Sequence, residues 1–129
     1  MNISNSFLVM ISAFTLGCGP ADGGFRSLGV EQFEQFIVET AEVTILDART
    51  AQEFADGHLR NAVNIDVNGA DFESRAIGSL DKSLPVAVYC RSGRRSKRAA
   101  GILVKNGYNV VELDCGIICW TNSGKEIVK

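Results

Sequence analysis

Several features that would point to common classes of protein are missing from this sequence. It has no Cys-x-x-Cys motif, no internal repeat and no low-complexity tract, and it contains one histidine and two prolines. The missing motif counts against a thiol–disulfide oxidoreductase. The formal net charge of −2 counts against a protein whose whole surface binds nucleic acid or membranes. With 129 residues, 46% of them hydrophobic, the chain can bury a core without a metal or disulfide scaffold.

The first 24 residues differ from the rest of the chain. No Lys or Arg occurs before Arg26, and residues 7–17 are all apolar or small. This stretch is shorter than the roughly 20 residues that a membrane-spanning helix needs, but it suits the apolar centre of a secretory signal. The alternative is an apolar leader with no role in sorting.

Residues 15–18 resemble the lipobox of bacterial lipoproteins, in which the cysteine is lipidated and becomes the mature N-terminus. The resemblance implies that Cys18 is a lipidation site and that the protein is exported to the periplasm and tethered to the membrane. We therefore expect a signal- or lipoprotein-type leader with a linker over residues 1–24 and a folded domain over residues 25–129. Without a working signal, the protein would stay in the cytoplasm.

Past residue 24, short apolar runs alternate with segments of helical periodicity, which is the pattern of a parallel α/β sheet. The predicted strands are residues 43–46, 62–65, 85–89 and 109–113, with a possible short edge strand over 25–28. The predicted helices are residues 30–40, 72–80 and 95–106, the last one ending at Gly107. Because the apolar runs are almost continuous, we expect helices to cover both faces of the sheet.

Cys90 directly follows a predicted buried strand, and the next residues turn the chain into a helix that starts near Arg95. In open α/β sheets, ligands bind just beyond the carboxyl ends of the strands. Backbone N–H groups of a tight loop, the helix N-terminus and neighbouring arginines would all stabilise a thiolate there. We therefore predict that Cys90 is a nucleophile rather than a small buried hydrophobe.

Basic residues are concentrated just after this cysteine, since five of the 13 lie between positions 91 and 98. Lys97 and Arg98 are expected on a solvated helix face. The loop residues form the candidate substrate-binding group, whose arginines would attract an anion. This group consists of Arg91, Ser92, Gly93, Arg94 and Arg95.

Several separate segments, in their order and spacing, resemble the rhodanese homology domain. They are residues 45–49, 53–54, 57–65, 89–96 and 116–120. The resemblance extends from about residue 25 to the C-terminus. It implies a single-domain rhodanese-like α/β fold, with a five-stranded parallel sheet flanked by helices on both faces. It also implies that the catalytic cysteine, here Cys90, carries a sulfane sulfur as a persulfide.

Loop length separates this chemistry from that of cysteine-based phosphatases of similar architecture. Those enzymes need an arginine six positions after the cysteine, whereas Ser96 stands at that position here and Arg95 comes one residue earlier. The smaller ring of N–H groups suits a single sulfur atom better than a tetrahedral oxyanion. Phosphatase or arsenate reductase activity is therefore disfavoured.

The expected activity is that of a thiosulfate-type sulfurtransferase that works in two steps. The Cys90 thiolate takes sulfur from a small anionic donor such as thiosulfate, and a thiol, a protein acceptor or cyanide then removes it. No metal or organic cofactor is needed. Two other functions stay open: a rhodanese-like binding or regulatory module with little turnover, and a thiol–disulfide oxidoreductase that uses Cys90 with Cys115.

Asp47 and Arg49 end a predicted strand at the same sheet edge as Cys90. They either brace the active loop or form an ordinary ion pair. His58 is expected to be structural, because persulfide transfer needs no base once the thiolate has formed. Asn61 stands where the resembled family usually has glycine, and asparagine tolerates a left-handed backbone.

Cys115 and Cys119 depart from the family pattern near its C-terminal tryptophan. Cys119 could simply be a small apolar filler. The turn at Cys115 follows a strand expected beside the Cys90 strand. We hypothesise that Cys115 resolves the Cys90 persulfide, or forms a disulfide with Cys90 or with Cys119.

Overall fold

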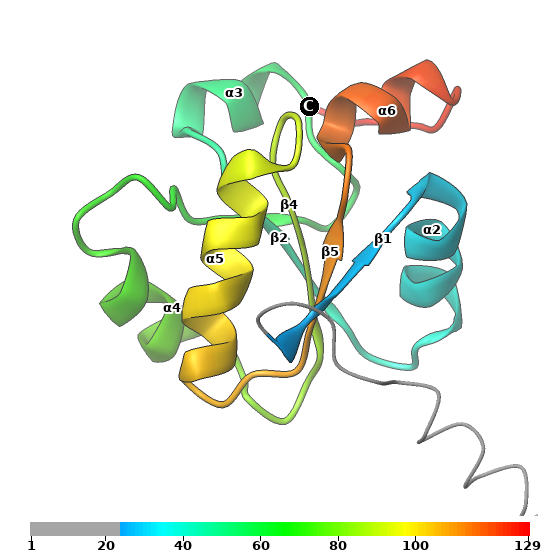
Figure 1. The fold of residues 1–129 in the computed structure, drawn as a ribbon. Helices are drawn as coiled ribbons and strands as arrows, with labels where there is room; N and C mark the ends of the chain where they lie inside the picture. The colour runs from blue at the N-terminus through cyan, green and yellow to red at the C-terminus, as the bar shows by residue number, and fades with distance from the viewer. Residues whose placement is uncertain (1–23) are drawn as a thin grey trace, which may run out of the picture.

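A five-stranded, wholly parallel sheet forms the centre of the computed structural model, which describes residues 24–129 (Figure 1). The strand order is β1-β5-β4-β2-β3. The strands are β1 (Arg26–Leu28), β2 (Thr44–Asp47), β3 (Val63–Asn64), β4 (Val86–Tyr89) and β5 (Val110–Leu113). The predicted parallel α/β fold is confirmed, including the short edge strand.

The expected leader and Cys18 lie outside the described residues, except for Gly24 at the end of the leader. Export and lipidation therefore stay predictions. Within residues 24–129, no helix has the length and apolar character needed to cross a membrane.

Helices cover both faces of the sheet, as expected (Figure 1). They are α2 (Val30–Glu39), α3 (Ala51–Asp56), α4 (Phe72–Ser79), α5 (Arg94–Lys105) and α6 (Gly116–Asn122). Helices α4 and α5 pack on one face, and α2 and α6 pack on the other. The helices α3 and α6 were not predicted, because six or seven residues are too few for a clear helical period.

Strand β4 is the centre of the core, because all four of its residues are buried. Val86 and Val88 belong to the apolar cluster under α4 and α5, whereas Ala87 and Tyr89 belong to the cluster under α2 and α6. This alternation follows from the two-residue period of a strand that is covered on both faces. The chain therefore leaves β4 at the middle of the carboxyl edge of the sheet, which is where Cys90 lies.

The turn between α3 and β3 agrees with the structural roles expected there. The ring of His58 stacks on that of Phe54, with centroids 3.8 Å apart and planes 4° from parallel. The backbone of His58 also pairs with that of Val128. Asn61 has the left-handed φ of 68° that asparagine tolerates better than most residues. These features fix the turn that leads into β3, which pairs with β2.

Candidate active site

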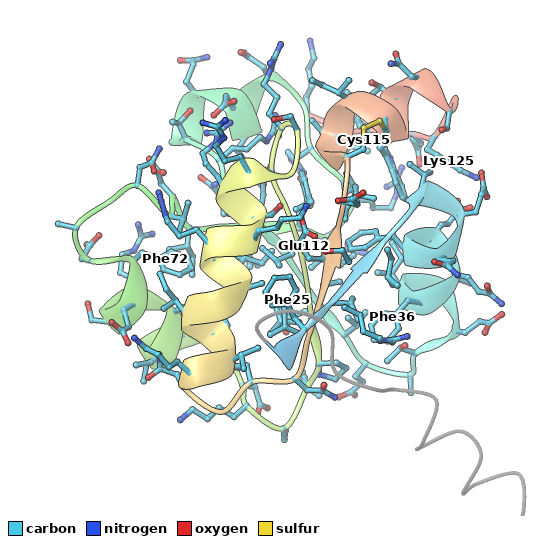
Figure 2. All side chains as sticks on the ribbon, viewed as in Figure 1. Phe25, Phe36, Phe72, Glu112, Cys115 and Lys125 are labelled. Carbon is cyan, nitrogen blue, oxygen red and sulfur yellow. A yellow bond between two sulfur atoms is a disulfide. The ribbon has the colours of Figure 1, made fainter. Side chains whose placement is uncertain are left out.

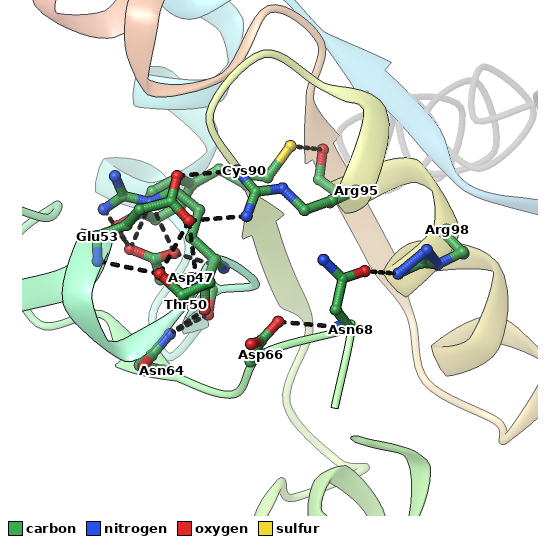
Figure 3. A network of polar contacts seen from close by, with 12 residues as sticks. Asp47, Thr50, Glu53, Asn64, Asp66, Asn68, Cys90, Arg95 and Arg98 are labelled. Atoms are coloured by element: carbon green, nitrogen blue, oxygen red, sulfur yellow. Dashed lines mark hydrogen bonds and ion pairs between the residues drawn. The ribbon is translucent and has the colours of Figure 1, made fainter. Parts of the chain in front are cut away.

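The chain after β4 makes a tight loop around the Cys90 sulfur. Cys90 is 1% exposed and is a free thiol, and the N–H of Gly93 donates to its Sγ at 3.1 Å. Gly93 has a left-handed φ of 105° and caps α5, so the helix begins at Arg94, one residue earlier than predicted. The predicted strand–loop–helix geometry around Cys90 is therefore present (Figure 3).

Two arginines of the predicted substrate-binding group lie open to solvent. Arg91, Ser92 and Arg94 are exposed, whereas Gly93 is buried. In the part of the chain that the structure describes, neither Arg91 nor Arg94 forms an ion pair. Their positive charges are therefore not paired with a carboxylate in this part of the chain, and a role in binding an anionic donor stays a prediction.

Arg95 differs from Arg91 and Arg94 in that it forms an ion pair, because Glu53 of α3 binds both of its terminal nitrogens. The distances are 2.7 Å from Nη1 to Oε1 and 3.0 Å from Nη2 to Oε2 (Figure 3). These hydrogen bonds are the main reason that the pKa of Glu53 falls from its ordinary 4.5 to about 2. They also raise the pKa of Arg95. Arg95 therefore ties the start of α5 to α3, and any contact with substrate stays a prediction.

Replacing Glu53 with glutamine should make the protein less stable in a pH-dependent way. A carboxylate whose pKa is lowered on folding stabilises the protein above its unfolded pKa and loses that effect as pH falls through the folded value. The side chains of Glu53 and Arg95 are 28% and 22% exposed, respectively, so solvent weakens their interaction. We therefore expect the substitution to lower the free energy of unfolding by about 1–2 kcal/mol at pH 7. Urea denaturation should show this deficit shrinking between pH 4.5 and about 2.

The matched control is Glu39→Gln, which alters an exposed carboxylate at the end of α2. We expect it to change the free energy of unfolding by less than about 0.5 kcal/mol at any of these pH values. A deficit for Glu53→Gln that stays constant from pH 7 to pH 2 would contradict the assigned ion pair.

Asp47 and Arg49 form a buried network that includes Tyr89. Asp47 accepts from Arg49 Nη2 at 2.7 Å and from the Tyr89 hydroxyl at 2.7 Å, and Arg49 Nη2 also donates to the Gly57 carbonyl. The Tyr89 hydroxyl accepts in turn from the Leu59 N–H at 3.1 Å. All three residues are at most 6% exposed.

The network accounts for two pKa shifts and for the position of the active loop. Burial alone would lower the pKa of Arg49, but the hydrogen bonds and charge of Asp47 outweigh that effect and raise it. Burial, followed by the charge of Asp47, raises the pKa of Tyr89. Because Tyr89 directly precedes Cys90, the network holds the last residue of β4 in place. This contact with the residue before Cys90 supports the bracing role, which stays a prediction beside that of an ordinary structural ion pair.

A third group beside Cys90 was not anticipated from the sequence. The Cys90 thiol donates to Ser96 Oγ at 3.4 Å, and Ser96 Oγ donates to Glu112 Oε2 at 2.5 Å. Glu112 lies on β5 (Figure 2) and is fully buried. A single charged residue inside the apolar run of β5 was the signal that could have revealed it.

Lys97 is not simply solvated, which corrects the expectation for this residue. Its Nζ lies 3.2 Å from Glu112 Oε2 and 2.8 Å from Asp114 Oδ1. Burial would lower the pKa of Lys97, but the bonds to Asp114 and Glu112 raise it. The sequence could not show this because the partners lie on another element, 15 and 17 residues away.

The cysteines near the C-terminus adopt one of the arrangements in our hypothesis. Cys115 forms a disulfide with Cys119 across the first turn of α6, with their Cα atoms 5.6 Å apart (Figure 2). The start of α6 does approach the active loop, because the Ile117 N–H donates to the Cys90 carbonyl at 2.9 Å. However, Cys90 stays free, so the Cys90–Cys115 pair needed for the oxidoreductase alternative is not formed.

The fold and site together define a parallel α/β protein with a loop-enclosed cysteine at the carboxyl edge of its sheet. Residues 30–123 match the family model described as the rhodanese-like domain, and the chain belongs to that family. Within residues 24–129, no three His, Cys, Asp or Glu side chains are grouped so that they could hold a metal ion.

Curated relatives and solved structures agree with this assignment. A "Sulfurtransferase" of Allochromatium vinosum is 33% identical over 99 residues, which cover 76% of this chain and 90% of that protein. "Thiosulfate sulfurtransferase GlpE" of Shewanella oneidensis is 36% identical over 98 residues, covering 74% and 92%. A rhodanese-related protein from Thermoplasma volcanium superposes with a TM-score of 0.70 at 28% identity, covering 80% and 97%. These relatives support sulfur transfer as the general activity of the family.

Proposed function

We propose that this protein moves sulfane sulfur from a small anionic donor such as thiosulfate to a thiophilic acceptor through a persulfide on Cys90. The observation that carries the proposal is the surroundings of the Cys90 sulfur. It is a free thiol, it accepts a hydrogen bond from the Gly93 N–H at 3.1 Å, and it lies in the loop between the end of β4 and the start of α5. The name of the Shewanella relative supports thiosulfate as the donor.

In the first step, the donor is drawn to the mouth of the loop by Arg91 and Arg94. Both are exposed and lack ion-pair partners among residues 24–129. Cys90 gives up its thiol proton, its sulfur attacks the outer sulfur of thiosulfate, and sulfite leaves with the electrons of the broken S–S bond. The resulting persulfide anion rests among the N–H groups of the loop. Each such charge-assisted hydrogen bond contributes about 1.5–3 kcal/mol.

In the second step, a thiol, a protein acceptor or cyanide takes the outer sulfur and regenerates Cys90. This reaction needs access to the outer sulfur but no metal or organic cofactor. A phosphatase would instead need a free arginine to hold its oxyanion. Arg95 cannot readily fill that role, because Glu53 binds both of its terminal nitrogens.

The proposal is tested by incubating the reduced protein with thiosulfate and measuring its intact mass. The wild type should gain one sulfur atom that cyanide removes, and Cys90→Ser should gain none. A double variant, Cys115→Ser with Cys119→Ser, is the matched control and should load like the wild type. It removes the other two cysteines of the folded domain.

Two results would overturn the proposal in favour of its alternatives. If the wild type gains no sulfur while Cys90 is a free thiol, the protein is better described as a binding or regulatory module. If sulfur loading requires Cys115 or Cys119, Cys90 is not sufficient as the carrier. An oxidoreductase would instead show reversible oxidation of Cys90 with Cys115.

A further inference from the structure

Glu112 is a buried acid that the two-step scheme leaves without a role. It is fully buried in β5, yet it accepts hydrogen bonds from three side chains. The donors are Ser27 Oγ at 2.6 Å, Ser96 Oγ at 2.5 Å and Lys97 Nζ at 3.2 Å. Hydroxyl-to-oxygen distances of 2.5–2.6 Å are typical of bonds to an ionised carboxylate. Glu112 therefore carries a negative charge in this arrangement.

The negative charge of Glu112 determines whether Ser96 donates a hydrogen bond to Cys90 or accepts one from it. Ser96 has one hydroxyl proton, and the short bond to Glu112 uses it. Ser96 Oγ can then only accept from Cys90, whose thiol donates to it at 3.4 Å. The structure therefore contains a continuous chain of hydrogen bonds from the Cys90 thiol through Ser96 to the Glu112 carboxylate.

Loading Cys90 with sulfur places a negative charge at the cysteine end of this series of hydrogen bonds. The persulfide is an anion, and only one hydroxyl group separates it from Glu112. Two buried anions this close repel each other strongly, and Ser96 cannot donate its single proton to both. Lys97 offsets the repulsion only in part, because its side chain is 42% exposed and is shared with Asp114.

We propose that Glu112 accepts the Cys90 proton when sulfur is loaded and returns this proton to Cys90 when sulfur is delivered. The inference rests on the function proposed above and deepens it. The buried site would then hold a single negative charge throughout, on Glu112 when the cysteine is free and on the persulfide when it is loaded.

The protons and electrons balance in both steps. During loading, the Cys90 proton passes to Ser96 Oγ while the Ser96 proton passes to Glu112 Oε2. The Sγ–S bond forms as the S–S bond of thiosulfate breaks, and sulfite leaves with that electron pair. During delivery to cyanide, the electrons of the Sγ–S bond stay on Sγ, thiocyanate leaves, and the proton returns through Ser96. Glu112 is then a carboxylate again.

Infrared difference spectroscopy of the full chain tests this inference directly. Loading the wild type with thiosulfate should produce the C=O stretch of a buried carboxylic acid, and cyanide should abolish it. The band should be absent from Glu112→Gln and unchanged in the matched control Glu39→Gln, whose carboxylate is exposed. If Glu112→Gln folds poorly, the absence of the band from the loaded wild type still overturns the inference.

Intact mass measured on the same samples separates this inference from the proposed function. A gain of one sulfur without the carboxylic acid band would overturn the role of Glu112 and leave the sulfurtransferase function standing. No gain of sulfur would overturn both. A gain of sulfur with the band would support both.

The pH dependence of the rate of sulfur loading provides a second test, because it would not change if Glu112 had only a structural role. Without an internal acceptor, the Cys90 proton must pass to solvent, so loading of Glu112→Gln should depend more steeply on pH than loading of the wild type. Ser96→Ala removes the bridge and should slow loading by about tenfold or more near neutral pH. Identical pH profiles for the wild type and Glu112→Gln would overturn the proposal.

Discussion

Replacing Asp47 with alanine is expected to lower the free energy of unfolding by about 3–5 kcal/mol. The substitution would leave the Arg49 guanidinium, part of a side chain that is 7% exposed, without its carboxylate partner. It would also remove the acceptor of the buried Tyr89 hydroxyl, a group that is costly to leave unsatisfied. Urea denaturation at neutral pH measures the change.

Asp56→Ala is the matched control for this substitution. Asp56 is exposed at the end of α3, and its side chain accepts only from Gln52 among the described residues. We expect it to alter stability by less than about 0.5 kcal/mol. If Asp47→Ala cost less than about 1 kcal/mol, the network around Tyr89 would not be what holds the end of β4.

Replacing Gly93 with alanine is expected to slow sulfur loading by about 100-fold or more. Gly93 has a φ of 105°, which alanine rarely adopts, and an added Cβ would collide with the Asp114 carbonyl. The backbone must shift to relieve both conflicts. That shift moves the N–H that donates to Cys90 Sγ, so the loop loses the donor that stabilises the sulfur anion. A time course of intact mass with thiosulfate measures the rate.

Gly101→Ala serves as the control because Gly101 lies in the interior of the same helix, α5. A Cβ there meets no atom within 4 Å and the backbone is not left-handed, so alanine should stabilise the protein by about 0.5–1 kcal/mol. Loading should proceed at the wild-type rate. If Gly93→Ala also loads at that rate, the Gly93 N–H contributes little to the stability of the sulfur anion.

Much of the fold was predictable because the relevant forces act locally along the chain. Near-continuous apolar runs identified β4 and β5, and helical periodicity identified α2 and α5 within one or two residues. The position of Cys90 at the end of a buried strand placed it at the ligand-binding edge of the sheet. The turn at Asn61 was implied by the resemblance to the rhodanese domain, which usually has glycine there, and asparagine tolerates its left-handed backbone.

The sequence alone therefore determined the α/β class, the place of Cys90 and the basic loop that follows it. Only the tertiary structure decided which side chains those elements bring together. In the folded protein, Arg95 forms an ion pair with Glu53, 42 residues away, and Ser96 links Cys90 to Glu112 by hydrogen bonds. Cys115 forms a disulfide with Cys119 rather than with Cys90. The physical reason is that periodicity reports which face of an element is buried. Polar contacts between elements depend on strand order, register and side-chain direction, which the chain acquires only when it packs.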